Sequence, residues 1–140
     1  MRSDIDIKDD IYNALLHSPL VIEVNGKLYK RKRPINSTSE DVVISVLANN
    51  MAQRQMANIN VNIYVKDDYV KTDDEEQGQN EEQSQRLRKL CQLAIQSVNA
   101  IHGKDFRVTF DKENGQRVIE SEGEHIINNK LLYQIINEEL

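Results

Sequence analysis

The chain has 140 residues, 39% of them hydrophobic and 29% charged, and a formal net charge of −5. This length fits one domain spanning residues 1–140, and the longest apolar run, Val42-Val43-Ile44, is far shorter than the roughly 18 residues of a membrane span. Cys91 is the sole cysteine, which excludes an internal disulfide, and the acidic N-terminus lacks the apolar segment of a signal peptide, so we expect a protein of a reducing cytoplasm.

The first predicted element is a helix over residues 4–17. Three apolar residues recur there at every fourth position, namely Ile7, Ile11 and Leu15. This spacing places them on one face of a helix. Asp4 can cap its start, and Ser18-Pro19 ends it, because proline disfavours a helical conformation in the residue before it.

A hairpin is predicted next. Residues 20–24 are typical of one strand and residues 27–31 of its partner, and Asn25-Gly26 between them is the dipeptide that two-residue hairpin turns prefer. The returning arm and its exit carry five cations, Lys27, Lys30, Arg31, Lys32 and Arg33. Such a run favours contact with phosphates or with an acidic partner. Two other interpretations remain open: charge that protects an edge strand from pairing, and neutralisation of the chain's own acidic segment.

Two further strands follow the hairpin. Residues 41–47 are apolar on both faces, which predicts a central strand, and residues 48–57 form a polar connection with two methionines. Residues 58–65 alternate strictly, with apolar side chains on one face and Asn58, Asn60, Asn62 and Tyr64 on the other. We therefore expect one face of this strand in the core and the other against water or a polar partner.

Residues 66–82 form the acidic part of the chain, with eight Asp and Glu residues against two lysines, a local charge of −6. From about residue 71 to residue 85 large apolar side chains are almost absent, so burial cannot offset the entropy of ordering this segment. We therefore predict a mobile acidic loop over residues 71–85.

The C-terminal half predicts a long helix and several strands. Apolar residues spaced by three and four favour an amphipathic helix over residues 84–102, and residues 106–110 and 116–120 are typical of strands joined by a tight turn at Asn114-Gly115. Residues 126–136 fit either a helix or a strand. The elements together predict an α+β fold, a mostly antiparallel sheet with a short N-terminal helix and one long amphipathic helix packed on one face.

Catalytic chemistry finds little support in the sequence. His17 and His102 lie at predicted helix ends, His125 lies in a polar turn, and Cys91 falls on the apolar stripe of the long helix. The segment from Asp111 resembles a calcium loop only briefly, because its glycine stands at the fifth position instead of the sixth. We expect no catalytic, cofactor-binding or metal site and no enzymatic activity, and we keep an enzyme of unrecognised type as a minor hypothesis.

The sequence resembles the tail-terminator or tail-completion proteins of long-tailed bacteriophages and prophages over about residues 5–136. The segments that carry the resemblance are Ala14-Leu15-Leu16-His17-Ser18-Pro19-Leu20, Gly26-Lys-Leu-Tyr29 with Arg33-Pro34, Glu40-Asp41-Val-Val-Ile44 and Ile59-Asn-Val-Asn-Ile-Tyr64-Val-Lys-Asp67, followed by the long helix and alternating strands. The acidic insertion at 71–85 is longer than the usual connection. The resemblance favours a strand for residues 130–136.

The resemblance implies a homohexameric ring that stops growth of the tail tube and joins the tail to the head connector. Tail-tube and connector proteins would be its partners, and the protein would move from the bacterial cytoplasm into the virion. The expected contact residues are Lys30, Arg31, Lys32, Arg33, Met51, Arg54, Met56, Asn58, Asn60, Asn62 and Tyr64. Direct contact with DNA stays open. The alternative function is a small nucleic-acid-binding or regulatory module that uses residues 27–33.

Overall fold

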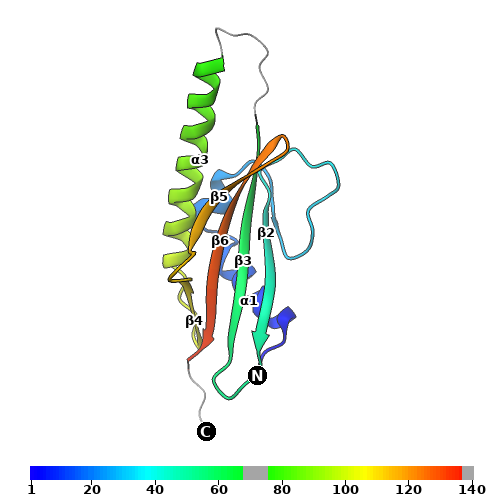
Figure 1. The fold of residues 1–140 in the computed structure, drawn as a ribbon. Coiled ribbons are helices and arrows are strands. Elements are labelled where there is room, and N and C mark those ends of the chain that lie inside the picture. The colour runs from blue at the N-terminus through cyan, green and yellow to red at the C-terminus, as the bar shows by residue number, and fades with distance from the viewer. Residues whose placement is uncertain (68–75, 137–140) are drawn as a thin grey trace.

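The computed structural model describes residues 1–67 and 76–136, and it has the predicted α+β architecture (Figure 1). One six-stranded sheet is backed on a single face by the helices, and the long helix runs along one flank of the sheet. The elements in chain order are α1 (Asp4–Leu15), α2 (Pro19–Glu23), β1 (Leu28–Tyr29), β2 (Val42–Asn50), β3 (Met56–Lys66), α3 (Glu76–Asn99), β4 (Phe106–Phe110), β5 (Gln116–Ser121) and β6 (Glu124–Ile135).

The sheet has the strand order β1-β2-β3-β6-β4, and β5 also pairs with β6. The longest ladder joins β3 to β6 and runs from Met56 opposite Gln134 to Lys66 opposite Glu124. β4 and β5 share the other edge of β6, and all of these pairings are antiparallel. Only β1 is parallel to its neighbour, β2. The sheet is therefore mostly antiparallel, as the sequence predicts.

The core lies between the helices and one face of the sheet. The apolar residues of β3 that alternate in the sequence, from Ile59 to Val65, are at most 4% exposed. They pack with the predicted stripe of α1 and with the stripe of α3 that contains Leu90, Ala94 and Val98. The period-two and period-four patterns of the sequence therefore identify the two layers of the core.

The predicted hairpin over residues 20–31 is wrong. Residues 19–23 form the short helix α2, and the side chain of Ser18 accepts a hydrogen bond from the backbone N–H of Val21 at its start. Serine at the cap and proline at the first helical position are signals that begin a helix. The same Ser18-Pro19 pair that ends α1 therefore begins α2.

Asn25-Gly26 makes long-range contacts instead of a hairpin turn. The Asn25 Oδ1 accepts a hydrogen bond of 2.7 Å from the backbone N–H of Glu40, and the Gly26 N–H donates one of 3.2 Å to the Glu40 carbonyl. A Cβ on Gly26 would lie 2.5 Å from that carbonyl oxygen, so only glycine fits there. These contacts align β1 beside the start of β2.

The structure also decides the predictions for the C-terminal and acidic segments. Residues 124–135 form the strand β6, which decides between the two interpretations of residues 126–136. The predicted loop over residues 71–85 is wrong from residue 76 onward, because α3 begins at Glu76. Glutamate and glutamine are good helix formers, so a helix can continue through a polar segment without apolar partners. Residues 68–75 lie outside the described part of the chain.

Candidate protein interface

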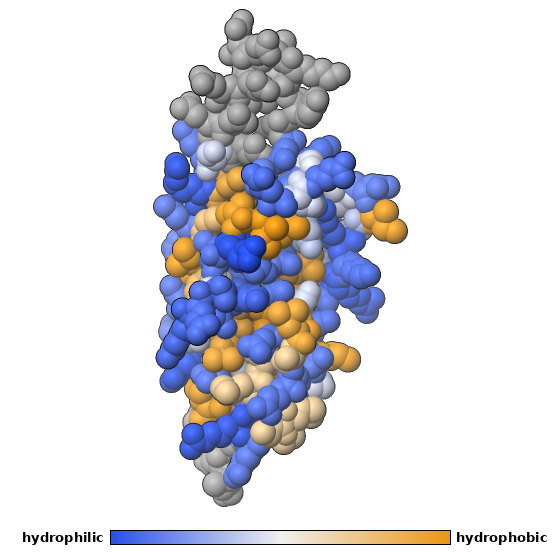
Figure 2. Space-filling model, viewed as in Figure 1, coloured by the Kyte–Doolittle hydropathy of each residue, from blue (hydrophilic) through white to orange (hydrophobic). Residues whose placement is uncertain are grey.

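The face of the sheet opposite the helices, called the open face below, is the surface to which most of the predicted contact residues belong. The polar residues of β3, from Asn58 to Tyr64, point to it, and the strand register places their neighbours on the same side. Ser45 and Lys130 flank Asn60, and Asn128 lies beside Asn62. No helix of residues 1–67 or 76–136 covers this face, which is turned toward the viewer in Figures 1 and 2.

The centre of the open face carries side-chain amides. The Asn128 Nδ2 donates a hydrogen bond of 2.7 Å to Asn62 Oδ1, which ties β6 to β3 through side chains. Asn60 Oδ1 is buried and accepts no hydrogen bond from any described group. An unsatisfied buried carbonyl costs free energy.

Apolar side chains interrupt the polar open face. Leu47 of β2 is 55% exposed and Met56 of β3 is 39% exposed. Leu47 lies at a register shift between Val46 and Ala48, where the ladder between β2 and β3 is irregular. Figure 2 shows hydrophobic patches on this otherwise hydrophilic face. Such a mixture is typical of the contact surfaces of proteins that associate without being obligate oligomers.

The open face also carries cations that the sequence analysis did not select. Arg107 lies opposite Gln134, and Arg117 lies opposite Asn128, so both point to the same side as Lys130. Both arginines are exposed. Apolar and polar residues alternate over residues 106–110, which predicts that Arg107 points away from the core. The register of β4 and β5 against β6 is needed to place these cations on one surface.

The basic run 27–33 is split between internal pairs and exposed charges. Lys30 Nζ lies 2.9 Å from Asp9 and 4.8 Å from the centre of the Tyr12 ring. Arg33 lies 2.8 Å from Glu124 and 3.9 Å above the Tyr64 ring. Two cations of the run thus neutralise acidic groups of the chain itself, on α1 and β6. The others, Lys27, Arg31 and Lys32, are exposed.

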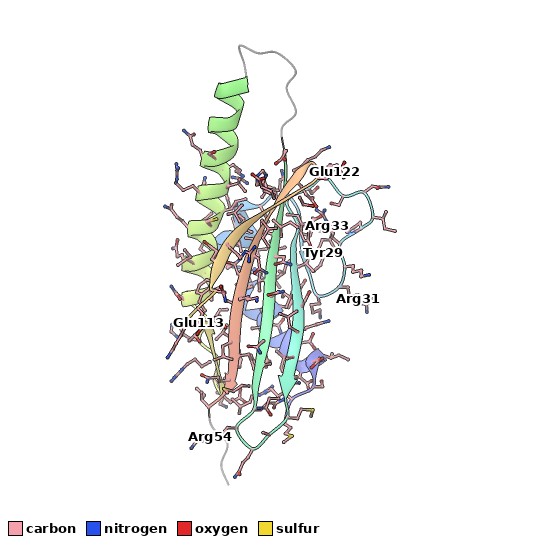
Figure 3. The ribbon with its side chains drawn as sticks, in the orientation of Figure 1. Tyr29, Arg31, Arg33, Arg54, Glu113 and Glu122 are labelled. Atoms are coloured by element: carbon pink, nitrogen blue, oxygen red, sulfur yellow. The ribbon has the colours of Figure 1, made fainter. Side chains whose placement is uncertain are left out.

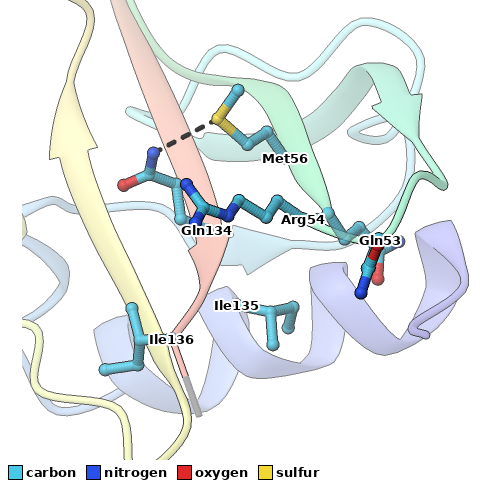
Figure 4. A pocket seen from close by; sticks show the side chains of 7 residues that line it. Gln53, Arg54, Met56, Gln134, Ile135 and Ile136 are labelled. Carbon is cyan, nitrogen blue, oxygen red and sulfur yellow. Dashed lines mark hydrogen bonds between the residues drawn. The ribbon is translucent and has the colours of Figure 1, made fainter. Parts of the chain in front are cut away.

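The remaining predicted contact residues lie at the β2–β3 turn, residues 51–55. Met51 is 54% exposed at this turn, and Arg54 reaches from it toward Gln134 (Figure 4). The turn and the end of β6 border a groove of about 840 Å³, inside which Gln134 Nε2 lies 3.2 Å from the sulfur of Met56. Met56 therefore joins this turn to the open face.

The predicted contact residues thus occupy three places. Met56, the three asparagines and Tyr64 share the open face, Met51 and Arg54 lie at the turn, and Lys30 to Arg33 lie in the segment that precedes β2. Figure 3 shows Arg54 and Arg31 at two of these places. Arg33 connects the segment before β2 to the open face, because its guanidinium stacks on Tyr64.

Several titratable groups of the described residues have defined surroundings. His125 Nδ1 lies 2.5 Å from Asp67, and burial raises the pKa of the half-buried Cys91 thiol. Asp111 accepts hydrogen bonds from the backbone N–H groups of Glu113 and Asn114, which lower its pKa. No three His, Cys, Asp or Glu side chains of the described residues are grouped so that they could hold a metal ion.

No helix in the described part of the chain is both long enough and apolar enough to cross a membrane. No family model matches the chain, and no curated protein matches it. The function proposed below rests on the open face, with its side-chain amides, cations and apolar patches.

Proposed function

We propose that this protein is a non-enzymatic structural protein of a phage or prophage virion, of the tail-terminator or neck type. It acts by assembling into a ring, a hexamer by the resemblance, that caps the tail tube and docks to the head connector. The observation that carries the proposal is the open face. Antiparallel sheets often have one solvated face, but this one also exposes Leu47 and Met56, and no described layer covers them.

A ring requires two different surfaces on each copy, because a head-to-tail interface joins unlike patches and closes by rotation. The open face supplies one surface, and the segment 30–39 beyond β1 supplies a second on the β2 side of the sheet. The order of elements that underlies the phage resemblance is also the order in the fold, except that α2 and a two-residue strand replace the predicted hairpin.

The alternative, a nucleic-acid-binding module built on residues 27–33, draws less support from the geometry. Lys30 and Arg33 are engaged with Asp9 and Glu124, so part of the basic run is not available to phosphates without breaking internal ion pairs.

The test is the assembly state of the purified protein and of two arginine variants. We expect wild-type protein to form rings, seen by light scattering after size exclusion and by electron microscopy. Asn58→Arg, in the middle of the open face, should shift the protein to smaller species, because a bulky charge would be buried in the contact. Gln92→Arg, an exposed position on α3, is the matched control and should leave the rings intact.

A wild-type protein that stays monomeric at high concentration and on addition of tail tubes would contradict the proposal. Equal loss of rings in both variants would assign the contact to another surface. The genes beside that of this protein offer an independent check, since portal, capsid and major-tail genes are expected there.

A further inference from the structure

The segment 30–39 is an anchored loop on the β2 side of the sheet. At one end the Arg33 guanidinium is held between Glu124 and the Tyr64 ring, both of them on neighbouring strands. At the other end the Ser37 hydroxyl donates a hydrogen bond of 2.5 Å to Asp41, and the Ser37 N–H bonds to the Pro34 carbonyl. These contacts fix the position of the residues between them.

The tip of this loop presents an isoleucine to solvent. Ile35 is 92% exposed, the highest value among the exposed large hydrophobic side chains of the described residues. Pro34 precedes it with a fixed φ, and Asn36 follows it with a φ of +64°, a conformation that asparagine tolerates better than most residues. The backbone on both sides therefore holds Ile35 outward.

Two cations precede this apolar tip on the same loop. Arg31 and Lys32 are exposed on the same loop, and Figure 3 shows Arg31 on the outer side of the molecule, beyond β2. An apolar side chain beside free cations is complementary to an apolar hollow that has a carboxylate at its rim. The loop is already ordered, so little conformational entropy is lost when it docks.

The open face contains a hollow of about 210 Å³ with a mixed lining. Its apolar residues are Leu47, Ile59 and Leu131, and its polar ones are Asn58, Asp111 and Lys130. An enclosed apolar cavity of about 150 Å³ holds a benzene molecule, so the volume of this hollow is large enough for a branched aliphatic side chain. Two backbone N–H groups keep Asp111 anionic by lowering its pKa.

The other hollows described for the chain are less suitable. The groove at the β2–β3 turn is lined by Arg54 and by no carboxylate, whereas Asp111 offsets Lys130 in the hollow of the open face. The hollow beside Gly123 is lined by Arg33 and Thr38 of the loop itself, so the loop of another copy could enter it only by displacing them. Charge and unoccupied space therefore favour the hollow between Leu47 and Asp111.

We propose that the loop 31–36 of one copy inserts Ile35 into the Leu47–Asp111 hollow on the open face of a second copy. The donor and the receptor are different surfaces of the same chain, so the contact is head-to-tail and can propagate around a ring. This inference rests on the proposed ring function and identifies the contact that builds the ring.

The first experiment compares two exposed isoleucines. Ile35→Ser should weaken self-association about tenfold to a hundredfold, as measured by sedimentation velocity over a concentration series, because a buried aliphatic side chain is lost from the contact. Ile22→Ser, on α2 and 75% exposed, is the matched control and should associate like wild type. Both positions are exposed, so the unfolding midpoints should stay unchanged.

The second experiment traps the contact. In a Cys91→Ser background, Ile35→Cys combined with Leu47→Cys should give disulfide-linked chains on a non-reducing gel under mild oxidation. Each single variant, and the pair Ile22→Cys with Leu47→Cys, should not give the linked ladder. Trapping also detects contacts too brief to appear in sedimentation.

The outcomes separate the two proposals. Rings that persist in Ile35→Ser, without trapping of residues 35 and 47, overturn the loop contact and leave the ring function standing. A specific 35–47 disulfide in a protein that never forms rings supports the contact and overturns the ring. Flotation of wild-type protein, but not Ile35→Ser, with phosphatidylserine vesicles would assign the loop to a lipid surface and overturn the proposal.

Discussion

Tyr133 is fully buried on β6, and its hydroxyl donates a 2.6 Å hydrogen bond to Asp10 of α1. Asp10 also lies 3.3 Å from Arg2, which in turn pairs with Asp105. The Tyr133 hydroxyl thus links α1 and the N-terminal segment to the end of β6 through a small cluster of polar side chains.

Tyr133→Phe is expected to lower the free energy of unfolding by about 2 kcal/mol at neutral pH, because Asp10 loses a hydrogen-bond donor in a half-buried site. Burial, and then the hydrogen bond to Asp10, raise the pKa of Tyr133 well above its ordinary value. The unfolded tyrosine therefore ionises first, so this stabilisation is complete below pH about 10 and is lost above it.

Urea denaturation at pH 7 and at several values between about pH 9 and 11 measures both effects. The difference in stability between wild type and Tyr133→Phe should shrink as the pH rises above about 10. A constant difference across that range would contradict the assigned role of the hydroxyl.

Individual residues also mark the limit of what the sequence predicts. The buried face of β3 follows from strict alternation, so Ile59, Ile63 and Val65 are identified without a structure. The partners of Tyr133 and of Arg33 lie far away in the chain, and no local pattern reports them. The exposure of Ile35 was not predicted for the same reason, since composition alone does not show which isoleucine a loop holds outward.

At the scale of elements, α3 is fixed to the rest of the fold by Arg86. Its guanidinium bonds to both carboxylate oxygens of Glu40, at 2.8 and 2.5 Å, and to the carboxylate and backbone carbonyl of Glu23. Glu40 is only 7% exposed. Arg86 therefore connects α3, α2 and the segment that leads into β2.

Arg86→Met is expected to destabilise the fold by about 2 kcal/mol, because it leaves the Glu40 carboxylate buried without its cation. This is less than the cost for a fully enclosed pair, since the arginine side chain is 30% exposed. Adding Glu40→Gln should recover part of the loss. Thermal unfolding monitored by circular dichroism measures the three variants.

Lys89→Met is the control for that series. Lys89 is 57% exposed and pairs with Glu23 on the same side of α3, so its removal should change the unfolding midpoint much less than Arg86→Met. Equal effects of the two substitutions would show that Glu40 does not depend on Arg86.

The sequence predicts helices and strands correctly where apolar residues recur with a regular period. Predictions that rest on a two-residue turn signal or on composition alone are wrong. The helix α1 and the strands β3 and β4 follow from spacing. Asn25-Gly26 wrongly predicts a hairpin turn, because its partner Glu40 is 15 residues away and local sequence does not reveal that contact. Composition predicts a loop for the acidic segment, whereas α3 begins at Glu76. The parallel pairing of β1 with β2 depends on the same distant contact.

At the scale of the whole molecule, charge is distributed unevenly. The chain has a net charge of −5, yet the open face gathers Arg107, Arg117 and Lys130 on strands β4, β5 and β6. The rest of the surface is therefore more acidic than the total suggests. The loop 31–36 that the proposed contact brings to this face is cationic as well, with Arg31 and Lys32 exposed, so the two surfaces repel each other except where Asp111 attracts the loop.

Salt should consequently strengthen the proposed contact. Between 0.05 and 0.5 M NaCl the Debye length falls from above 10 Å to roughly half that distance, which screens repulsion between exposed charges. We expect the ring population in light scattering to increase over this range, and Arg107→Gln with Arg117→Gln to reduce the dependence. A ring population that falls with salt would mean that attraction between unlike charges dominates the contact.

The N-terminus and the last described residues of β6 lie at the same end of the sheet, beside the turn that contains Arg54, whereas Glu122 and Arg33 lie toward the opposite end (Figures 1 and 3). If copies stand side by side with their strands roughly along the ring axis, the two rims of the ring are chemically different. One rim would display Met51 and the N-terminus of every copy, and the other would display tight turns and the basic loop. The proposed adaptor between two unlike structures needs that polarity, and a label fused to the N-terminus would mark a single rim.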